Sequence, residues 1–160
     1  MTSLAEPFRE SHLPPPAPAA GRYAAHVMVD GWLFLSGQFP RWGSQLRYAG
    51  RVGAELTEDE ASHAARLAAL NVLAQIRAAL GGFERVVSLA RVEGHVAAAP
   101  DWNNAPAVLD HASQVFGEAL GERGRHARSA FVALRLPLDA TVELVVTVRV
   151  RPAADPGALP

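Results

Sequence analysis

Two amphipathic helical segments, 57–80 and about 104–120, restrict the possible folds of this chain most strongly. Each carries apolar residues at helical spacing along one side, so each must pack that side against another layer. The order strand, strand, helix, strand, helix, strand, strand predicts an α+β fold in which both helices cover one face of a mixed sheet. The opposite sheet face is then bare, and such a face usually marks an interface between subunits. The β-like segments lie at about 24–29, 32–38, 86–98, 129–136 and 141–150.

Short local signals mark the ends of the first helix. Thr57, with Glu60 three residues later, is typical of a capping box, and Gly81 is a typical helix end. Asn71 and Gln75 lie on the apolar side of this helix, so each needs a hydrogen-bond partner if it is buried.

Two turns are predicted to join neighbouring strands. Asp30-Gly31 stands between two apolar runs and indicates a hairpin. A short turn at 137–139 is expected to make 129–136 and 141–150 a second, tight hairpin. The glycine-containing segment 40–54 is predicted to be a loop with at most a short strand.

Length and composition indicate one globular domain. The chain has 160 residues, of which 49% are apolar and 19% charged, and this suits one core. We expect a Pro-rich N-terminal tail over 1–20, a single domain over 21–151 and a C-terminal tail over 152–160. No apolar run approaches the roughly 20 residues that cross a bilayer, and no secretory signal is evident. A cytoplasmic location with no membrane partner is therefore predicted.

Several kinds of chemistry are excluded by residues that the chain lacks. It has no cysteine, and all 15 of its basic residues other than histidine are arginine. Thiolate nucleophiles, disulfides and lysine Schiff bases are therefore impossible. The 6 histidines show no metal-ligand spacing, and neither a metal nor a cofactor is expected. The formal net charge of -1 does not favour nucleic-acid binding.

Three groups of residues recur in a fixed order and carry a family resemblance. They are Gly21-Arg22-Tyr23, the Leu-Ser-Gly-Gln-Phe-Pro run 35–40, and the Gly-Arg-His-Ala-Arg-Ser run 124–129 followed by Leu136-Pro137 and Val142-Glu143. Over about 21–150 the chain resembles a divergent branch of the Rid family. These are the reactive intermediate deaminases, also called YjgF/YER057c/UK114 or endoribonuclease L-PSP proteins.

The resemblance implies a fold, an assembly and a reaction. The fold is chorismate-mutase-like, and the assembly is a homotrimer whose sheets form a central barrel, with three clefts between subunits. The reaction is hydrolysis of enamine or imine intermediates of the 2-aminoacrylate type to 2-oxo acids and ammonia, without a cofactor. The ligand is then a small carboxylate-bearing enamine, imine or 2-oxo acid.

Matching positions carry the family's site residues to this chain. Arg128 corresponds to the arginine that binds the substrate carboxylate, and Glu143 to the glutamate that positions or activates water. Tyr23 corresponds to a tyrosine lining the cleft. Ser36 and Gly37 correspond to a strand-end pair whose backbone contacts the ligand.

Three positions depart from the family pattern. Ala130 stands where a cysteine is frequent, and Asp110 replaces an asparagine on the second helix. Val145 replaces a second glutamate on the last strand. A carboxylate at 110 would repel an anionic ligand. Asp110 and Ala130 therefore favour a second hypothesis, a non-catalytic or regulatory protein that binds small carboxylates such as 2-oxo acids. A third is a ribonuclease, which the charge of the chain disfavours.

The residues themselves leave simpler interpretations open. Arg128 could form an ordinary ion pair, and Glu143 could be a structural or edge residue. Tyr23 could be a packing residue, and Ser36-Gly37 only a strand end or bulge. His126, between two arginines, could help to bind an anion or lie in a solvated turn.

Strand geometry adds an argument for an intersubunit site. In the expected hairpin Glu143 lies opposite about Leu134, which is six residues from Arg128. Six residues span roughly 20 Å at about 3.3 Å per residue. One chain would not bring both side chains to one small ligand, so the two are expected to come from different subunits.

Overall fold

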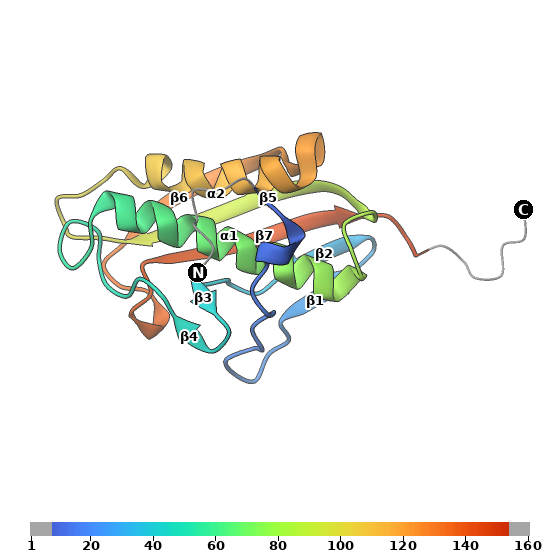
Figure 1. The fold of residues 1–160 in the computed structure, drawn as a ribbon, viewed down its shortest axis with the longest axis horizontal. Helices are drawn as coiled ribbons and strands as arrows, with labels where there is room; N and C mark the ends of the chain where they lie inside the picture. The colour runs from blue at the N-terminus through green and yellow to red at the C-terminus, as the bar shows by residue number, and fades with distance from the viewer. Residues whose placement is uncertain (1–7, 154–160) are drawn as a thin grey trace, which may run out of the picture.

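The computed structural model describes residues 8–153 and shows a five-stranded sheet with two helices on one face (Figure 1). The strand order is β1-β2-β7-β5-β6, and a separate two-stranded sheet is formed by β3 and β4. This confirms the predicted mixed α+β architecture. The strands are β1 His26–Val29, β2 Trp32–Leu35, β3 Arg41–Trp42, β4 Gln45–Leu46, β5 Val86–Ala97, β6 His126–Ala133 and β7 Val142–Val150. The helices are α1 Glu58–Leu80 and α2 Ala105–Leu120, and short 3-10 turns are η1 Glu10–His12, η2 Gly121–Gly124 and η3 Pro137–Asp139.

Local signals located the first hairpin and the first helix well. Asp30 and Gly31, with φ of 48° and 75°, adopt the left-handed backbone that a two-residue hairpin turn requires. Thr57 and Glu60 form the complete capping box of α1, and Gly81 ends it in the left-handed conformation. Both predictions are confirmed.

The two polar residues on the buried side of α1 have the partners that burial demands. Asn71 Nδ2 donates to the Arg41 carbonyl at 2.8 Å, and Gln75 Nε2 donates to the Ala17 carbonyl at 2.5 Å. Asn71 thus holds the β3–β4 hairpin against α1, and Gln75 holds the N-terminal segment there. Of the two predicted tails, residues 1–7 and 154–160 lie outside the described residues.

The expected hairpin between the last two strands is wrong. β6 pairs in parallel with β5, whereas β7 lies between β2 and β5 and is antiparallel to both. Alternate residues of β7, from Val142 to Val150, are fully buried in the core, and so apolar a strand is most stable with a neighbour on each side. β6 carries the exposed residues Phe131 and Val132 and takes the sheet edge. The short connection from β6 to β7 passes over the end of β5. The local sequence pattern does not reveal this crossing.

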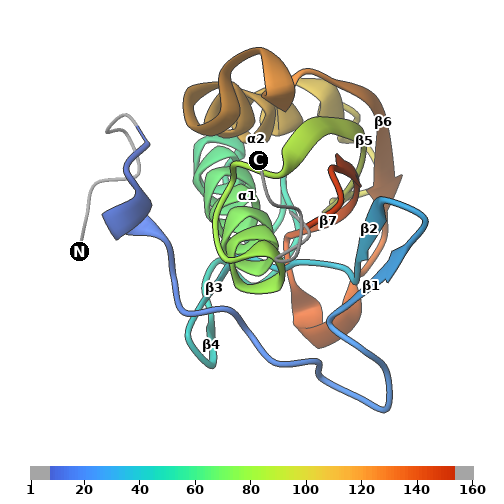
Figure 2. The same ribbon diagram turned by 90° about the vertical axis from the view of Figure 1, so that its right-hand side faces the viewer.

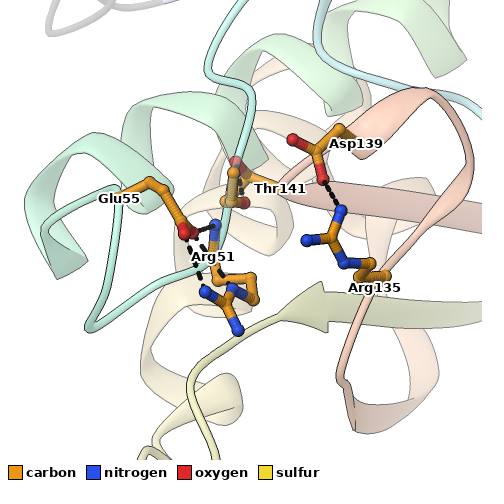
Figure 3. Close-up of polar contacts among 6 residues, drawn as sticks. Arg51, Glu55, Arg135, Asp139 and Thr141 are labelled. Carbon is orange, nitrogen blue, oxygen red and sulfur yellow. Dashed lines mark hydrogen bonds and ion pairs between the residues drawn. The ribbon is translucent and has the colours of Figure 1, made fainter.

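The connection between β6 and β7 is held by the loop that precedes α1 (Figure 3). Thr141 Oγ1 lies 2.6 and 2.9 Å from the carbonyl oxygens of Tyr48 and Gly50. Asp139 accepts from the Gly50 amide at 2.8 Å through its backbone and from Arg135 at 3.3 Å through its side chain. These contacts hold the connection in place, although β6 and β7 do not pair with each other as the sequence predicted.

The sheet face away from the helices is uncovered, as expected (Figure 2). Large apolar side chains from both ends of the sheet are half exposed: Val27 at 51%, Phe34 at 46% and Phe131 at 45%. The Arg149 guanidinium covers the Trp32 ring at 5.2 Å. We call this uncovered surface of the sheet the open sheet face.

None of the helices among residues 8–153 is long and apolar enough to cross a membrane.

Candidate functional site

The predicted site residues fall into two separate groups in one chain. Arg128, Asp110 and Ala130 lie where β6 passes α2, and we call them the Arg128 group. Tyr23, Ser36 and Gly37 line a hollow beyond the end of β2, and Glu143 of β7 lies against Gly37. We call these four residues the strand-end group.

Arg128 is held against α2 by three hydrogen bonds. Its Nη1 donates to Ser113 Oγ at 2.9 Å, and its Nη2 donates to Asp110 Oδ1 at 2.8 Å and to the Pro106 carbonyl at 3.3 Å. The Arg128 side chain is 20% exposed, whereas that of Asp110 is 71% exposed. The ion-pair interpretation of Arg128 is therefore correct. Its Nε–H and one Nη1–H make no hydrogen bond within the described chain, so these two donors are available to a ligand.

Close packing of α2 on the sheet makes this contact possible. Gly94 of β5 pairs with Ala130, and a side chain at Gly94 would collide with Leu109 of α2. Ala130 lies on the same side of β6 as Arg128 and packs partly buried against the core. It has no reactive group, so it can shape a site but supplies no chemistry.

His126 and Ser113 extend the Arg128 group into a hydrogen-bonded chain. His126 Nδ1 lies 2.7 Å from the Gly124 carbonyl, and Nε2 lies 3.0 Å from Ser113 Oγ. Because a carbonyl only accepts, we assign the proton to Nδ1; Nε2 then accepts from the Ser113 hydroxyl, which accepts from Arg128. Burial lowers the pKa of His126, which favours this neutral form. His126 also packs edge-on against Phe116, so the prediction of a solvated turn is wrong for this side chain.

Arg128, Ser113 and His126 line an open hollow of ≈ 510 Å³. Its remaining wall is formed by Arg125 and three glycines, Gly117, Gly121 and Gly124. Arg125 pairs with Glu122 at 3.2 Å on the surface. An anionic group can thus approach Arg128 from solvent. No sequence pattern points to Ser113, because its contacts with Arg128 and His126 depend on β6 lying beside α2.

The strand-end group is built around a bulge. Phe34 lies opposite Thr147, but Gln38 bridges to Leu144, so one side has an additional residue between these pairs. Ser36 lies in this bulge, and its Oγ donates to the Ala24 carbonyl at 2.7 Å. The bulge interpretation of Ser36-Gly37 is therefore correct, and it turns this backbone toward a hollow lined also by Tyr23 and Arg41.

Glu143 is a half-buried carboxylate that has no hydrogen-bond or ion-pair partner within the described part of the chain. It lies directly opposite His95 on β5, and the His95 ring stacks on Phe131 at 5.0 Å. Its carboxylate is so close to Gly37 that no other residue fits there without displacing it. Burial raises the pKa of Glu143, and His95 opposes this in part. Among residues 8–153 no hydrogen bond or ion pair holds this carboxylate, unlike a structural ion pair.

One chain does not bring Arg128 and Glu143 to one small ligand. Arg128 is level with Val92 and Glu143 with His95, on strands that flank β5. Their backbones are therefore roughly 14 Å apart, from about 3.3 Å per residue and about 4.8 Å per strand. Arg128 points toward α2, and Glu143 lies on the open sheet face. The hairpin argument for this separation was wrong, but the separation itself holds.

Comparisons with known proteins identify the relatives of this chain. Residues 9–149 match the model of a family described as YjgF/chorismate mutase-like, putative endoribonuclease. Protein TCP17 of Trypanosoma cruzi is 36% identical over 133 residues, which are 82% of this chain and 83% of that protein. A putative endoribonuclease from Shewanella oneidensis, solved as a crystal structure, is 35% identical with a TM-score of 0.83, covering 86% of this chain and 91% of that one. Escherichia coli TdcF with bound serine shares the fold at 22% identity, with a TM-score of 0.60 over 91% and 98% of the two chains.

The raised pKa of Glu143 predicts a pH-dependent stability difference. The ordinary pKa of this carboxyl is 4.5. Above that pH the unfolded chain ionises it readily, whereas burial disfavours the ionised form in the folded chain, so ionisation shifts the equilibrium toward unfolding. Glu143→Gln should therefore raise the free energy of unfolding at pH 7, and the gain should be much smaller at pH 3, where the carboxyl is largely protonated in both states. Urea denaturation at both pH values measures this. Glu122→Gln, at an exposed position, is the control, and an equal gain at both pH values would contradict the argument.

The pairing of Asp110 with Arg128 predicts that Asp110 competes with anionic ligands. Asp110→Asn keeps an oxygen that can accept from Arg128 but removes the negative charge. Affinity for 2-oxobutyrate, measured by calorimetry, should rise roughly twofold to fivefold, which is the range of an exposed ion pair. Asp139→Asn, which loses a similar exposed pair with Arg135, should leave the affinity unchanged. Unaltered binding in Asp110→Asn would show that the ligand does not use Arg128.

Proposed function

This chain belongs to the YjgF/chorismate mutase-like family, and we propose that it is a Rid-type deaminase. Its proposed reaction is hydrolysis of enamine and imine intermediates of the 2-aminoacrylate type to 2-oxo acids and ammonia. The observation that supports this most is that the side chains of Arg128 and Glu143 both keep hydrogen-bonding capacity that the described chain does not use. Arg128 is fixed yet keeps free donors beside an open hollow, and Glu143 is half buried without a bound partner.

Arg128 suits recognition of the carboxylate that every such substrate carries. A guanidinium binds a carboxylate through parallel N–H donors in one plane. Ser113 and the Pro106 carbonyl already fix its orientation, so little side-chain entropy is lost when a ligand binds. Asp110 is exposed enough to be displaced or to remain as a competitor.

Glu143 suits activation of water. After an enamine has tautomerised, its imine carbon is electrophilic and needs no metal or cofactor. A water oxygen bonds to that carbon while Glu143 accepts a water proton, which it then returns to the nitrogen. The carbon–nitrogen bond then breaks as the hydroxyl proton passes to the nitrogen, so that ammonia leaves and the 2-oxo acid remains. A pKa raised toward neutrality by burial improves a carboxylate as a base.

The proposed site requires a neighbouring copy of the chain. We place Arg128 of one subunit against the strand-end group of the next, in a homotrimer whose open sheet faces form a central barrel. The half-exposed apolar side chains of that face support such burial. Tyr23, at 53% exposure, and the Ser36-Gly37 backbone would complete the cleft wall.

A non-catalytic carboxylate-binding protein is the second candidate. Asp110 already accepts a hydrogen bond from Arg128, and Ala130 supplies no reactive group. Because position 145 is valine, Glu143 is the single carboxylate on the open sheet face of β7. These features weaken turnover without removing the binding of a 2-oxo acid. A ribonuclease is less well supported, because the net charge of -1 provides little attraction for phosphates. A cytoplasmic location remains a prediction from the sequence.

The deaminase proposal predicts faster release of ammonia from 2-aminoacrylate that a dehydratase generates in the assay. Arg128→Ala should lower this rate about 10- to 100-fold, because a charge-assisted bond to the substrate carboxylate is lost. Arg135→Ala, which loses an exposed pair on the β6–β7 connection, is the matched control and should retain the rate. Binding of 2-oxobutyrate without any acceleration would select the binding protein. RNA digestion that is equal in wild type and Arg128→Ala would indicate a contaminating nuclease.

The proposed trimer predicts that a charge on the open sheet face disrupts assembly. Phe34→Glu would place a carboxylate in the buried barrel, where ionisation is costly, and should convert trimers to monomers in sedimentation experiments. Met28→Glu alters a residue that is 42% exposed on the other face of the same hairpin and should leave the trimer intact. A wild-type monomer would contradict the intersubunit site.

A further inference from the structure

Arg41 is a second guanidinium at the strand-end group, and its charge has no acidic partner among residues 8–153. It lines the same hollow as Tyr23, Ser36 and Gly37. The ion pairs found among residues 8–153 do not include it. Its Nε is buried without a hydrogen bond, and its Nη2 makes only a long contact of 3.4 Å to the Ser44 carbonyl. A buried donor of a charged group is costly when unpaired, so an anion bound here would relieve that cost.

The protein holds Arg41 in this place from two sides. Its carbonyl accepts from the buried Asn71 of α1 at 2.8 Å, and its amide donates to the Phe39 carbonyl at 2.9 Å. Pairing with Leu46 closes the β3–β4 hairpin around it. The backbone is therefore fixed between α1 and the bulge, while among residues 8–153 the guanidinium has only the long contact to the Ser44 carbonyl. A structural arginine would show the opposite arrangement, with its charge satisfied.

We infer that the ligand of the proposed site carries a second acidic group, which Arg41 binds. This inference rests on the proposed function, in which Arg128 of the neighbouring subunit binds the first carboxylate. The substrate class is then the imine of an amino dicarboxylic acid, and the product is a 2-oxo dicarboxylic acid. The hollow has ≈ 20 Å³ for a water-sized group, so one end of the ligand is expected to enter it while the remainder lies in the cleft between subunits.

Calorimetry with two stable 2-oxo acids tests this inference. Wild type should bind 2-oxoglutarate about tenfold more tightly than 2-oxobutyrate at the same ionic strength, since one additional charge-assisted bond forms. Arg41→Gln should remove this preference by lowering the affinity for 2-oxoglutarate about tenfold, with a much smaller effect on 2-oxobutyrate. Arg41→Lys should keep part of it, because a lysine retains the charge but not the planar pair of donors.

Arg47→Gln is the matched control. Arg47 follows β4 of the same hairpin, is exposed and lies outside the hollow, so its loss should preserve the preference. Sedimentation should show that every variant keeps the wild-type assembly. If wild type binds both acids equally, or if Arg41→Gln retains the preference, the inference is wrong and the proposed function stands. If wild type binds neither acid, both are wrong.

Discussion

The central position of β7 determines how the rest of the molecule is arranged. Because β7 pairs with both β2 and β5, it brings Glu143 against Gly37 on one side and opposite His95 on the other. The same choice moves β6 to the sheet edge. There the Arg128 side chain contacts α2, and its strand pairs with β5 rather than with β7. Both halves of the proposed site therefore follow from which strand occupies the middle of the sheet.

The two halves differ in how their charges are stabilised. Arg128 is oriented before any ligand arrives, but Asp110 offsets part of its charge. Glu143 shows nearly the opposite arrangement, because burial disfavours its charge and, within the described chain, His95 alone counteracts that effect. Removing the charge of Glu143 should make the fold more stable, which is typical of a residue retained for function rather than for stability. A purely structural role explains the pairing of Arg128 with Asp110, but it does not explain a half-buried Glu143 carboxylate that has no hydrogen bond or ion pair among residues 8–153.

Local chemistry accounts for the parts of the fold that the sequence predicted well. The Asp30-Gly31 turn, the Thr57 cap and the need of Asn71 for a partner depend on a few neighbouring residues. The placement of β6 depends instead on competition among strands for the sheet centre, which no short pattern expresses. The family resemblance points to Arg128 and Glu143 as candidate site residues. The sequence does not point to Ser113 or Arg41, because the role proposed for each depends on contacts between distant segments.

The proposed site constrains the symmetry of any assembly that forms it. The Arg128 group lies at the α2 side of the edge strand, whereas Glu143 lies on the open sheet face. A contact that unites them joins two different patches, and such a contact generates a closed ring or an open filament rather than a two-fold dimer. A ring of few subunits, such as the proposed trimer, would turn all the open sheet faces inward and bury Phe34 and Phe131 together. In that arrangement one contact would both cover the bare face and complete the divided site.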